Sequence, residues 1–192
     1  MDLKNRRSIR LKKYDYSLTG AYFVTICTQN KECIFGEVLN DETKLSKEGH
    51  IIKEEWLKIA ILRPYVGLDQ FVVMPNHFHG ILWIQRDEQG TARCAPTVQQ
   101  FGKGVSGSLP AIIRAFKSAV TNRINVLRNT RGAPVWQRIF YEHVIRNESS
   151  LNRIREYILN NPLHWELDRE NPGRRGEHEF YRWLASFRKG PN

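Results

Sequence analysis

The sequence has few cysteines and no long apolar run. Its 192 residues include three cysteines, Cys27, Cys33 and Cys94. An odd number without metal-ligand spacing argues against a disulfide framework or a zinc knuckle and predicts free thiols. No apolar stretch approaches the roughly 20 residues that span a bilayer. Residues 1–7 also lack the apolar core of a signal peptide. We therefore expect a cytoplasmic protein without a membrane partner.

Acidic residues are also in short supply. The chain has 30 Lys and Arg against 20 Asp and Glu, which gives a formal net charge of +10. Such a surplus gains affinity for polyphosphates through counterion release, so nucleic acid is the leading expected partner. A basic surface that binds no nucleic acid is the alternative. The sequence lacks a Gly-rich loop of the Walker type, so no use of a nucleoside triphosphate is expected.

The composition indicates one globular domain with an appended segment. Hydrophobic residues make up 41% of the chain and charged residues 26%, which is typical of globular proteins. We assign residues 1–162 to this domain and residues 163–192 to a basic, aromatic tail, which suits stacking on unpaired bases or packing over the core. Residues 86–110 combine Gly and Pro with polar residues and lack periodicity. This predicts a long loop that is mobile or ordered by a partner.

The organising segment is an apolar hairpin at residues 72–84. Val72 to Met74 and Phe78 to Ile84 have strand composition, and a Pro-Asn turn separates them. Because side chains alternate along a strand, His77 and His79 point the same way, which is a chelating geometry. The alternative is a pair of half-buried histidines that close the hairpin without a ligand.

The remaining elements follow from hydrophobic periodicity and from cap and turn residues. Strands carry β-branched and aromatic residues, and helices carry apolar residues at helical spacing. The expected strands are residues 21–28, a small hairpin within 33–45 and the second half of 134–146. The expected helices run from Ser46 to before Pro64, from Ser108 onward, and from Asn147 or Ser149 to before Pro162.

Basic side chains gather in two places that suit DNA phosphates. One is the N-terminal arm, and the other is the polar side of the second and third helices. A solvated tail and a solvated helix face are the alternatives. The predicted DNA contacts are Arg6, Arg7, Arg10, Lys12, Lys13, Arg114, Lys117, Arg128 and Arg153.

The third helix carries a tyrosine at the border of its apolar stripe. Tyr157 and Asn161 are four residues apart and project from one side, and Arg153 shares that side. Taken alone, such a tyrosine is an amphipathic residue at the edge of a core.

Four segments in order give the chain a resemblance to a known family. They are Val73-Met74-Pro75-Asn76-His77-Phe78-His79, Ile113-Arg114-Ala115-Phe116-Lys117-Ser118, Trp136-Gln137 with His143-Val144-Ile145-Arg146-Asn147, and Tyr157-Ile158-Leu159-Asn160-Asn161-Pro162. With them the chain resembles HUH-class tyrosine transposases, specifically the REP-associated group.

The resemblance implies an α+β fold, a ferredoxin-like antiparallel sheet with helices, of the HUH endonuclease type. It also implies His77 and His79 as ligands of Mg²⁺ or Mn²⁺ and Tyr157 as nucleophile. Asn161, one helical turn after the tyrosine, would be the third ligand or would orient a water. Arg153 or Lys117 would favour the phenolate.

The implied activity is DNA strand transfer. Single-stranded, hairpin-flanked DNA would be cut and rejoined through a 5′-phosphotyrosine, by a monomer or a homodimer. One alternative is a catalytically silent binder of structured repeat DNA. The other is a metallohydrolase in which water attacks the phosphoester.

Overall fold

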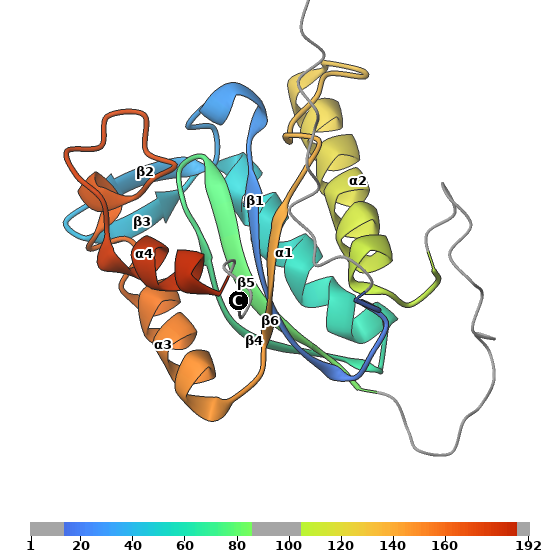
Figure 1. Cartoon of the computed structure of the whole chain (residues 1–192). Helices are drawn as coiled ribbons and strands as arrows, with labels where there is room; N and C mark the ends of the chain where they lie inside the picture. The colour runs from blue at the N-terminus through green and yellow to red at the C-terminus, as the bar shows by residue number, and fades with distance from the viewer. Residues whose placement is uncertain (1–13, 86–104, 188–192) are drawn as a thin grey trace, which may run out of the picture.

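The computed structural model describes residues 14–85 and 105–187, and its centre is a four-stranded antiparallel sheet in the order β4-β5-β1-β6 (Figure 1). A separate hairpin of two short strands flanks it. The α+β architecture with an antiparallel sheet is confirmed. The strands are β1 (Gly20–Cys27), β2 (Gly36–Leu39), β3 (Glu42–Leu45), β4 (Val66–Val73), β5 (His77–Ile84) and β6 (Tyr141–Ile145).

One face of the sheet is covered by two helices, α1 (Lys47–Leu62) and α2 (Leu109–Arg128). Alternate side chains of β5, among them Phe78 and Leu82, point to this face and are fully buried. Trp56 of α1 packs against Phe78 with ring centroids 4.6 Å apart. This layer holds the larger of the two apolar cores.

The opposite face is covered by α3 (Glu148–Leu159) and α4 (Glu179–Ser186) (Figure 1). Phe23 of β1 and Ile81 of β5 are fully buried beneath them. Because residues two apart share a face of a strand, His77 and His79 lie on the same side as Ile81. The C-terminal segment, residues 163–187, therefore packs on the face that carries the histidines.

Local sequence signals set most of the helix and turn positions. The Ser46 hydroxyl accepts a hydrogen bond from Gly49 N–H at 3.1 Å, and Asn147 Oδ1 accepts one from Ser150 N–H at 2.8 Å, so both predicted caps are confirmed. The turn between β2 and β3 places Asn40 in the left-handed region, with φ of 51°.

Two elements differ in detail from the sequence expectation. Ser108 precedes α2, but its hydroxyl donates to Val105 C=O at 2.7 Å and does not cap the helix. Strand β4 begins at Val66, well before the expected start at Val72. An irregularity between Leu68 and Phe71 interrupts its alternation, which hides the first half of the strand from a periodicity argument.

Several predictions fall outside the described residues. They concern Arg6, Arg7, Arg10, Lys12 and Lys13 of the arm, Cys94, and residues 86–104 of the long loop. Among the described cysteines, Cys27 and Cys33 are free thiols, as expected. The described helices include none of the length and apolarity needed to cross a membrane.

Candidate functional site

The two histidines of β5 lie side by side beneath α3. The pairing of β1 with β5 sets Cys27 opposite His77 and Thr25 opposite His79. The imidazole centroids are 4.5 Å apart, and the two residues are 0% and 1% exposed. The two imidazoles therefore lie on one face of β5, as predicted, and both are buried in the interior.

Asn76 fixes the tautomer of His77. The Asn76 Nδ2 group donates to the carbonyls of Lys31 at 3.1 Å and Glu170 at 2.7 Å. Its Oδ1 atom, 2.9 Å from His77 Nδ1, can only accept, so Nδ1 carries the proton. His77 Nε2 is consequently a bare lone pair directed at the site, the form that ligates a metal. Burial lowers the pKa of His77 to about 3, which keeps it neutral at neutral pH.

Thr25 and Tyr157 hold the second imidazole from its two sides. His79 Nδ1 lies 2.9 Å from the Thr25 hydroxyl, and His79 Nε2 lies 3.2 Å from the Tyr157 hydroxyl. The Phe23 ring stacks on the imidazole with centroids 5.4 Å apart. These contacts leave one orientation for the ring, with Nε2 toward the centre of the site.

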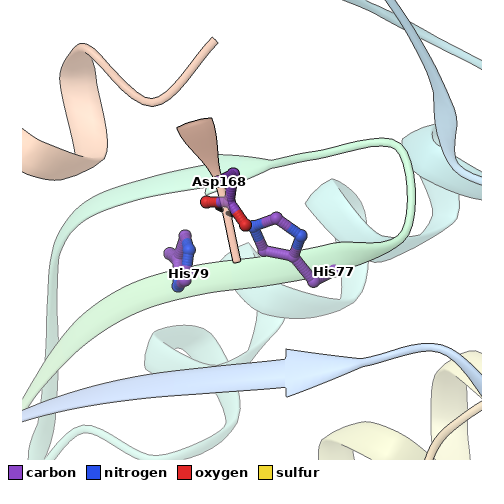
Figure 2. Close-up of side chains that lie close together, drawn as sticks. All are labelled: His77, His79 and Asp168. Atoms are coloured by element: carbon purple, nitrogen blue, oxygen red, sulfur yellow. Dashed lines mark ion pairs between the residues drawn. The ribbon is translucent and has the colours of Figure 1, made fainter. Parts of the chain in front are cut away.

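Asp168 supplies a carboxylate that completes the cluster. It follows the short helix η2 (Trp165–Leu167) and is 1% exposed. Its Oδ2 atom lies 3.8 Å from His77 Nε2. Figure 2 shows the carboxylate between the two imidazoles, and the ligand atoms of His77, His79 and Asp168 all lie within 4.8 Å of one another.

Four donors surround the Asp168 carboxylate. Oδ1 accepts from Glu170 N–H at 2.7 Å, and Oδ2 accepts from Tyr181 O–H at 2.7 Å, Tyr157 O–H at 3.1 Å and Asn161 Nδ2 at 3.1 Å. Burial opposes ionisation, but the neighbouring imidazoles and the Tyr181 hydroxyl outweigh it, so the pKa of Asp168 is lowered. The cluster therefore carries a negative charge deep in the protein.

Two atoms of the cluster lack partners. Within the part of the chain that the structure describes, His77 Nε2 and Asn161 Oδ1 are buried and make no hydrogen bond. Each such atom costs roughly 1–3 kcal/mol. Joined to the His79 imidazole and the Asp168 carboxylate, they form a mixed nitrogen and oxygen donor set of the kind that binds divalent cations. The residues present fit a divalent metal ion.

Asn161 reaches the site from beyond the helix. We expected it on the third helix, but α3 ends at Leu159. The Asn161 N–H donates to Ile158 C=O at 3.4 Å, which continues the turn. Asn161 is 1% exposed, and its Nδ2 contact with Asp168 leaves Oδ1 free for a ligand.

The Tyr157 hydroxyl is part of the same cluster but is covered. It lies 2.5 Å from the Tyr181 hydroxyl, and the Phe180 ring stacks on the Tyr157 ring at 3.7 Å with a 5° interplanar angle. Tyr157 is 5% exposed. Burial and the Asp168 charge raise the pKa of Tyr157 well above its usual value. One chain thus brings the phenol to the imidazoles, under a cover made by α4.

The described basic side chains lie at different distances from this cluster. Arg153 lines a cavity of about 170 Å³ together with Tyr157, and it contacts Glu179 at 3.6 Å. Lys117 belongs to α2 on the other face of the sheet, and its ammonium donates to Gln137 C=O at 2.6 Å and Arg138 C=O at 3.2 Å. It is therefore not beside the phenol.

The other two described basic residues also lie on α2. Arg128 donates to Glu48 at 2.7 Å, whereas Arg114 is exposed. Their roles as DNA contacts stay predictions.

Sequence reasoning missed Asp168 and Tyr181. Both stand in the segment assigned to a tail, and nothing in their spacing separates them from the other charged and aromatic residues there. Three acidic residues, Glu166, Asp168 and Glu170, follow the Asn161-Pro162 pair, and the sequence does not distinguish among them. Only the fold shows that this segment returns over β5.

Comparison with known proteins finds relatives in Haemophilus influenzae. It is 44% identical over 171 residues to an uncharacterized protein of Haemophilus influenzae, which covers 86% of this chain and 93% of that protein, so the two belong to one family. A second H. influenzae protein, provisionally named a REP-associated tyrosine transposase, is 27% identical over 152 residues, 78% of this chain and 73% of that protein. No family model matches the sequence.

A solved structure shares the fold. It is described as a REP-associated tyrosine transposase bound to a REP hairpin, and it matches 81% of this chain and 73% of its own with a TM-score of 0.53 and 20% identity. The resemblance inferred from the four sequence segments is confirmed.

Proposed function

We propose that this chain, a relative of the REP-associated tyrosine transposases, is a metal-dependent enzyme that cuts and rejoins single-stranded DNA through Tyr157. One observation carries the proposal. The Tyr157 hydroxyl lies 3.2 Å from His79 Nε2, inside a buried cluster where His77 Nε2 and Asn161 Oδ1 have no partner among the described residues. A tyrosine that only fills the core does not require an imidazole and unpaired polar atoms beside its hydroxyl.

The cluster residues divide into ligands and positioning groups. His77, His79, Asp168 and Asn161 would hold Mg²⁺ or Mn²⁺, while Asn76 keeps the His77 lone pair directed at the ion. A bound divalent cation supplies a Lewis acid for the scissile phosphate and offsets the negative field of Asp168 at the phenol. This ligand set adds a carboxylate to the three ligands expected from the sequence.

Tyr157 acts as the nucleophile. Its oxygen forms a bond to phosphorus, and the bond between phosphorus and the 3′ oxygen breaks. The products are a 5′-phosphotyrosine and a 3′-hydroxyl, which reverses the step when it attacks the same phosphorus. The Tyr157 hydroxyl lies 3.1 Å from Asp168 Oδ2 and 3.2 Å from His79 Nε2. Because these atoms would be committed to the ion, the phenolic proton passes to water, and the departing 3′ oxygen takes a proton from water.

The cover over Tyr157 sets a condition on activity. Since Phe180 stacks on the tyrosine ring and Tyr181 contacts its hydroxyl, a DNA strand reaches the phenol only when α4 moves. Phe180 and Tyr181 both belong to α4, so a local shift of α4 would uncover Tyr157 on that side, while Asp168, which also contacts the hydroxyl, stays in the cluster. The helices and sheet that hold the histidines can stay in place.

The expected substrate is single-stranded DNA beside a hairpin. The net charge of +10 favours a polyphosphate partner, and the solved relative is described as bound to a hairpin. Arg114, exposed on α2, and the basic N-terminal arm would contact the duplex. Because one chain supplies every group of the cluster, catalysis needs no second copy.

The test is a covalent DNA adduct. With Mn²⁺ and labelled single-stranded DNA, the wild type should give a denaturant-resistant protein–DNA band. Tyr157→Phe should abolish that band while DNA binding persists, and Tyr65→Phe, which removes a hydroxyl from a tyrosine 37% exposed, should not. An undiminished band from Tyr157→Phe would refute the assignment.

Asp168 favours a second candidate. Two histidines and one carboxylate also suit a hydrolase in which a metal-activated water attacks the phosphoester. Cleavage without a protein-linked product, surviving Tyr157→Phe, would select this reaction. Binding of hairpin DNA without any cleavage would instead indicate a silent binder.

A further inference from the structure

A cavity of about 210 Å³ adjoins the metal-ligand cluster on its β1 side. It lies between β1, the segment that leads into β6, and the C-terminal segment. Most of its wall is aromatic or aliphatic, formed by Phe23, Ile139, Phe140, Tyr141, Tyr181 and Leu184. Ile139 is 51% exposed, so one side of this cavity, the β1 pocket, meets solvent.

Several residues line the β1 pocket and also contact the cluster, two of them through side-chain hydroxyls. Thr25 lines the pocket, and its hydroxyl lies 2.9 Å from His79 Nδ1. Tyr181 lines the pocket with its ring, and its hydroxyl donates to Asp168 Oδ2 at 2.7 Å. A group bound in the pocket is thus one side chain away from the candidate metal site and from Tyr157.

The β1 pocket also has a polar edge. The Gln137 side-chain amide makes no hydrogen bond within the described residues, although the backbone of Gln137 is held by Cys27 C=O at 2.9 Å and by the Lys117 ammonium at 2.6 Å. A fixed backbone with an uncommitted amide suits ligand recognition. Arg169, whose guanidinium lies 5.1 Å from the Tyr181 ring centroid, and Glu170 add charged groups to the same pocket.

We propose that the β1 pocket binds one unstacked nucleobase of the DNA strand that is cut at Tyr157. A nucleobase has two apolar faces and a hydrogen-bonding edge, which match the aromatic walls that do not belong to α4, formed by Phe23, Phe140 and Tyr141, and the Gln137 amide. A phosphate does not match, since the walls are mainly apolar. This inference rests on the proposed function and deepens it, because the pocket would make cleavage depend on the base near the scissile phosphate.

The test uses the full chain with Tyr157→Phe, so that bound DNA stays intact. The tightest single-stranded oligonucleotide is selected from a randomised pool, and abasic sites are then introduced one position at a time. An abasic site at one position should lower the DNA affinity about tenfold, which is the effect expected from the loss of one base–aromatic stack. Gln137→Ala should flatten the base preference at that position alone, and Ile139→Trp should remove the abasic effect there. Gln70→Ala, an exposed amide on β4, should change neither.

The outcomes separate this inference from the proposed activity. Equal losses at every abasic position, or a base preference unchanged in both pocket variants, overturn the β1 pocket. If wild-type protein forms the covalent adduct and no position is sensitive, the pocket alone fails. If one position is sensitive and Gln137-dependent but no adduct forms, the pocket stands and the catalytic role of Tyr157 falls.

Discussion

Tyr181 and Tyr157 contact each other and a single carboxylate oxygen. Their hydroxyls lie 2.5 Å apart, and both donate toward Asp168 Oδ2, at 2.7 Å and 3.1 Å. One tyrosine comes from α3 and the other from α4, so this contact joins the candidate nucleophile to the segment that covers it. In the proposed reaction, a shift of α4 that opens the site would therefore also release Tyr157.

Tyr181→Phe should loosen that cover. The variant keeps the ring but loses a buried hydrogen bond to Asp168, which costs about 0.5–1.5 kcal/mol of stability. Adduct formation at Tyr157 should become several-fold faster because α4 is held less firmly. Single-turnover adduct assays and urea unfolding measure the two effects. A slower reaction at unchanged stability would show that Tyr181 assists the chemistry and does not act as a cover.

Asp168→Asn should weaken metal binding. The substitution keeps the shape but removes the negative charge from the cluster, so Mn²⁺ affinity should fall at least tenfold, as measured by calorimetric titration. Glu177→Gln, an exposed carboxylate of the same segment, should leave the affinity unchanged. Equal affinities in Asp168→Asn and wild type would remove Asp168 from the ligand set.

The nature of the donors also predicts a metal preference. Imidazole nitrogens bind Mn²⁺ better than Mg²⁺, because Mg²⁺ prefers ligands that are all oxygen atoms. We expect wild-type protein to bind Mn²⁺ more tightly than Mg²⁺ in the same titration and to form adduct at lower Mn²⁺ concentration. A tighter Mg²⁺ complex would indicate that the histidines do not ligate the ion.

The sequence was sufficient for the parts of the fold that depend on local chemistry. Strand alternation predicted that His77 and His79 share a face, and the Ser46 and Asn147 caps set the starts of two helices. Those signals act within a few residues. The depth of the histidines was not predictable in this way, since it depends on which helices cover each face.

The carboxylate of the site could not be predicted for the same reason. Asp168 contacts His77, which is 91 positions earlier in the chain by residue number, and only the return of residues 163–187 over the sheet brings them together. Tyr157 could be placed near the histidines through the family resemblance. Its cover by Phe180 and Tyr181 is a tertiary feature without a local signature.

Protonation of His77 should contribute to acid unfolding of the metal-free protein. Its pKa is about 3 in the folded state against an ordinary value of 6.5, so the unfolded chain takes up the proton first as the pH falls. The stability contribution is present above pH 6.5 and is lost as the pH falls from 6.5 toward 3. In His77→Gln the slope of unfolding free energy between pH 6 and 4.5 should decrease by about 1.4 kcal/mol per pH unit.

The control for this slope is His50→Gln, since His50 is exposed on α1. His143, whose pKa burial lowers to about 4, contributes in the same direction and is present in both variants. Urea titrations at closely spaced pH values give the slopes. Identical slopes in His77→Gln and wild type would mean that His77 titrates normally and is not buried as described.

Gly80, next to the histidine pair, should be intolerant of a side chain. A Cβ there would lie 2.7 Å from Phe78 Cε1 and 2.7 Å from Trp56 Cζ2, in the core between β5 and α1. Neither ring can retreat without disturbing the packing, so Gly80→Ala should destabilise the protein by about 1–3 kcal/mol. Because relief of this clash would displace β5, which carries both histidines, we also expect weaker Mn²⁺ binding at His77 and His79.

Gly67 on the neighbouring strand β4 is the matched control. A Cβ there would meet Trp83 Cβ at 3.6 Å, an ordinary contact, so Gly67→Ala should be neutral or slightly stabilising because alanine restricts the unfolded chain. Thermal unfolding and Mn²⁺ titration of both variants separate a local packing effect from a general effect of alanine in strands. Equal stability of the two variants would show that β5 can move away from α1, and that the histidine positions are not set by this contact.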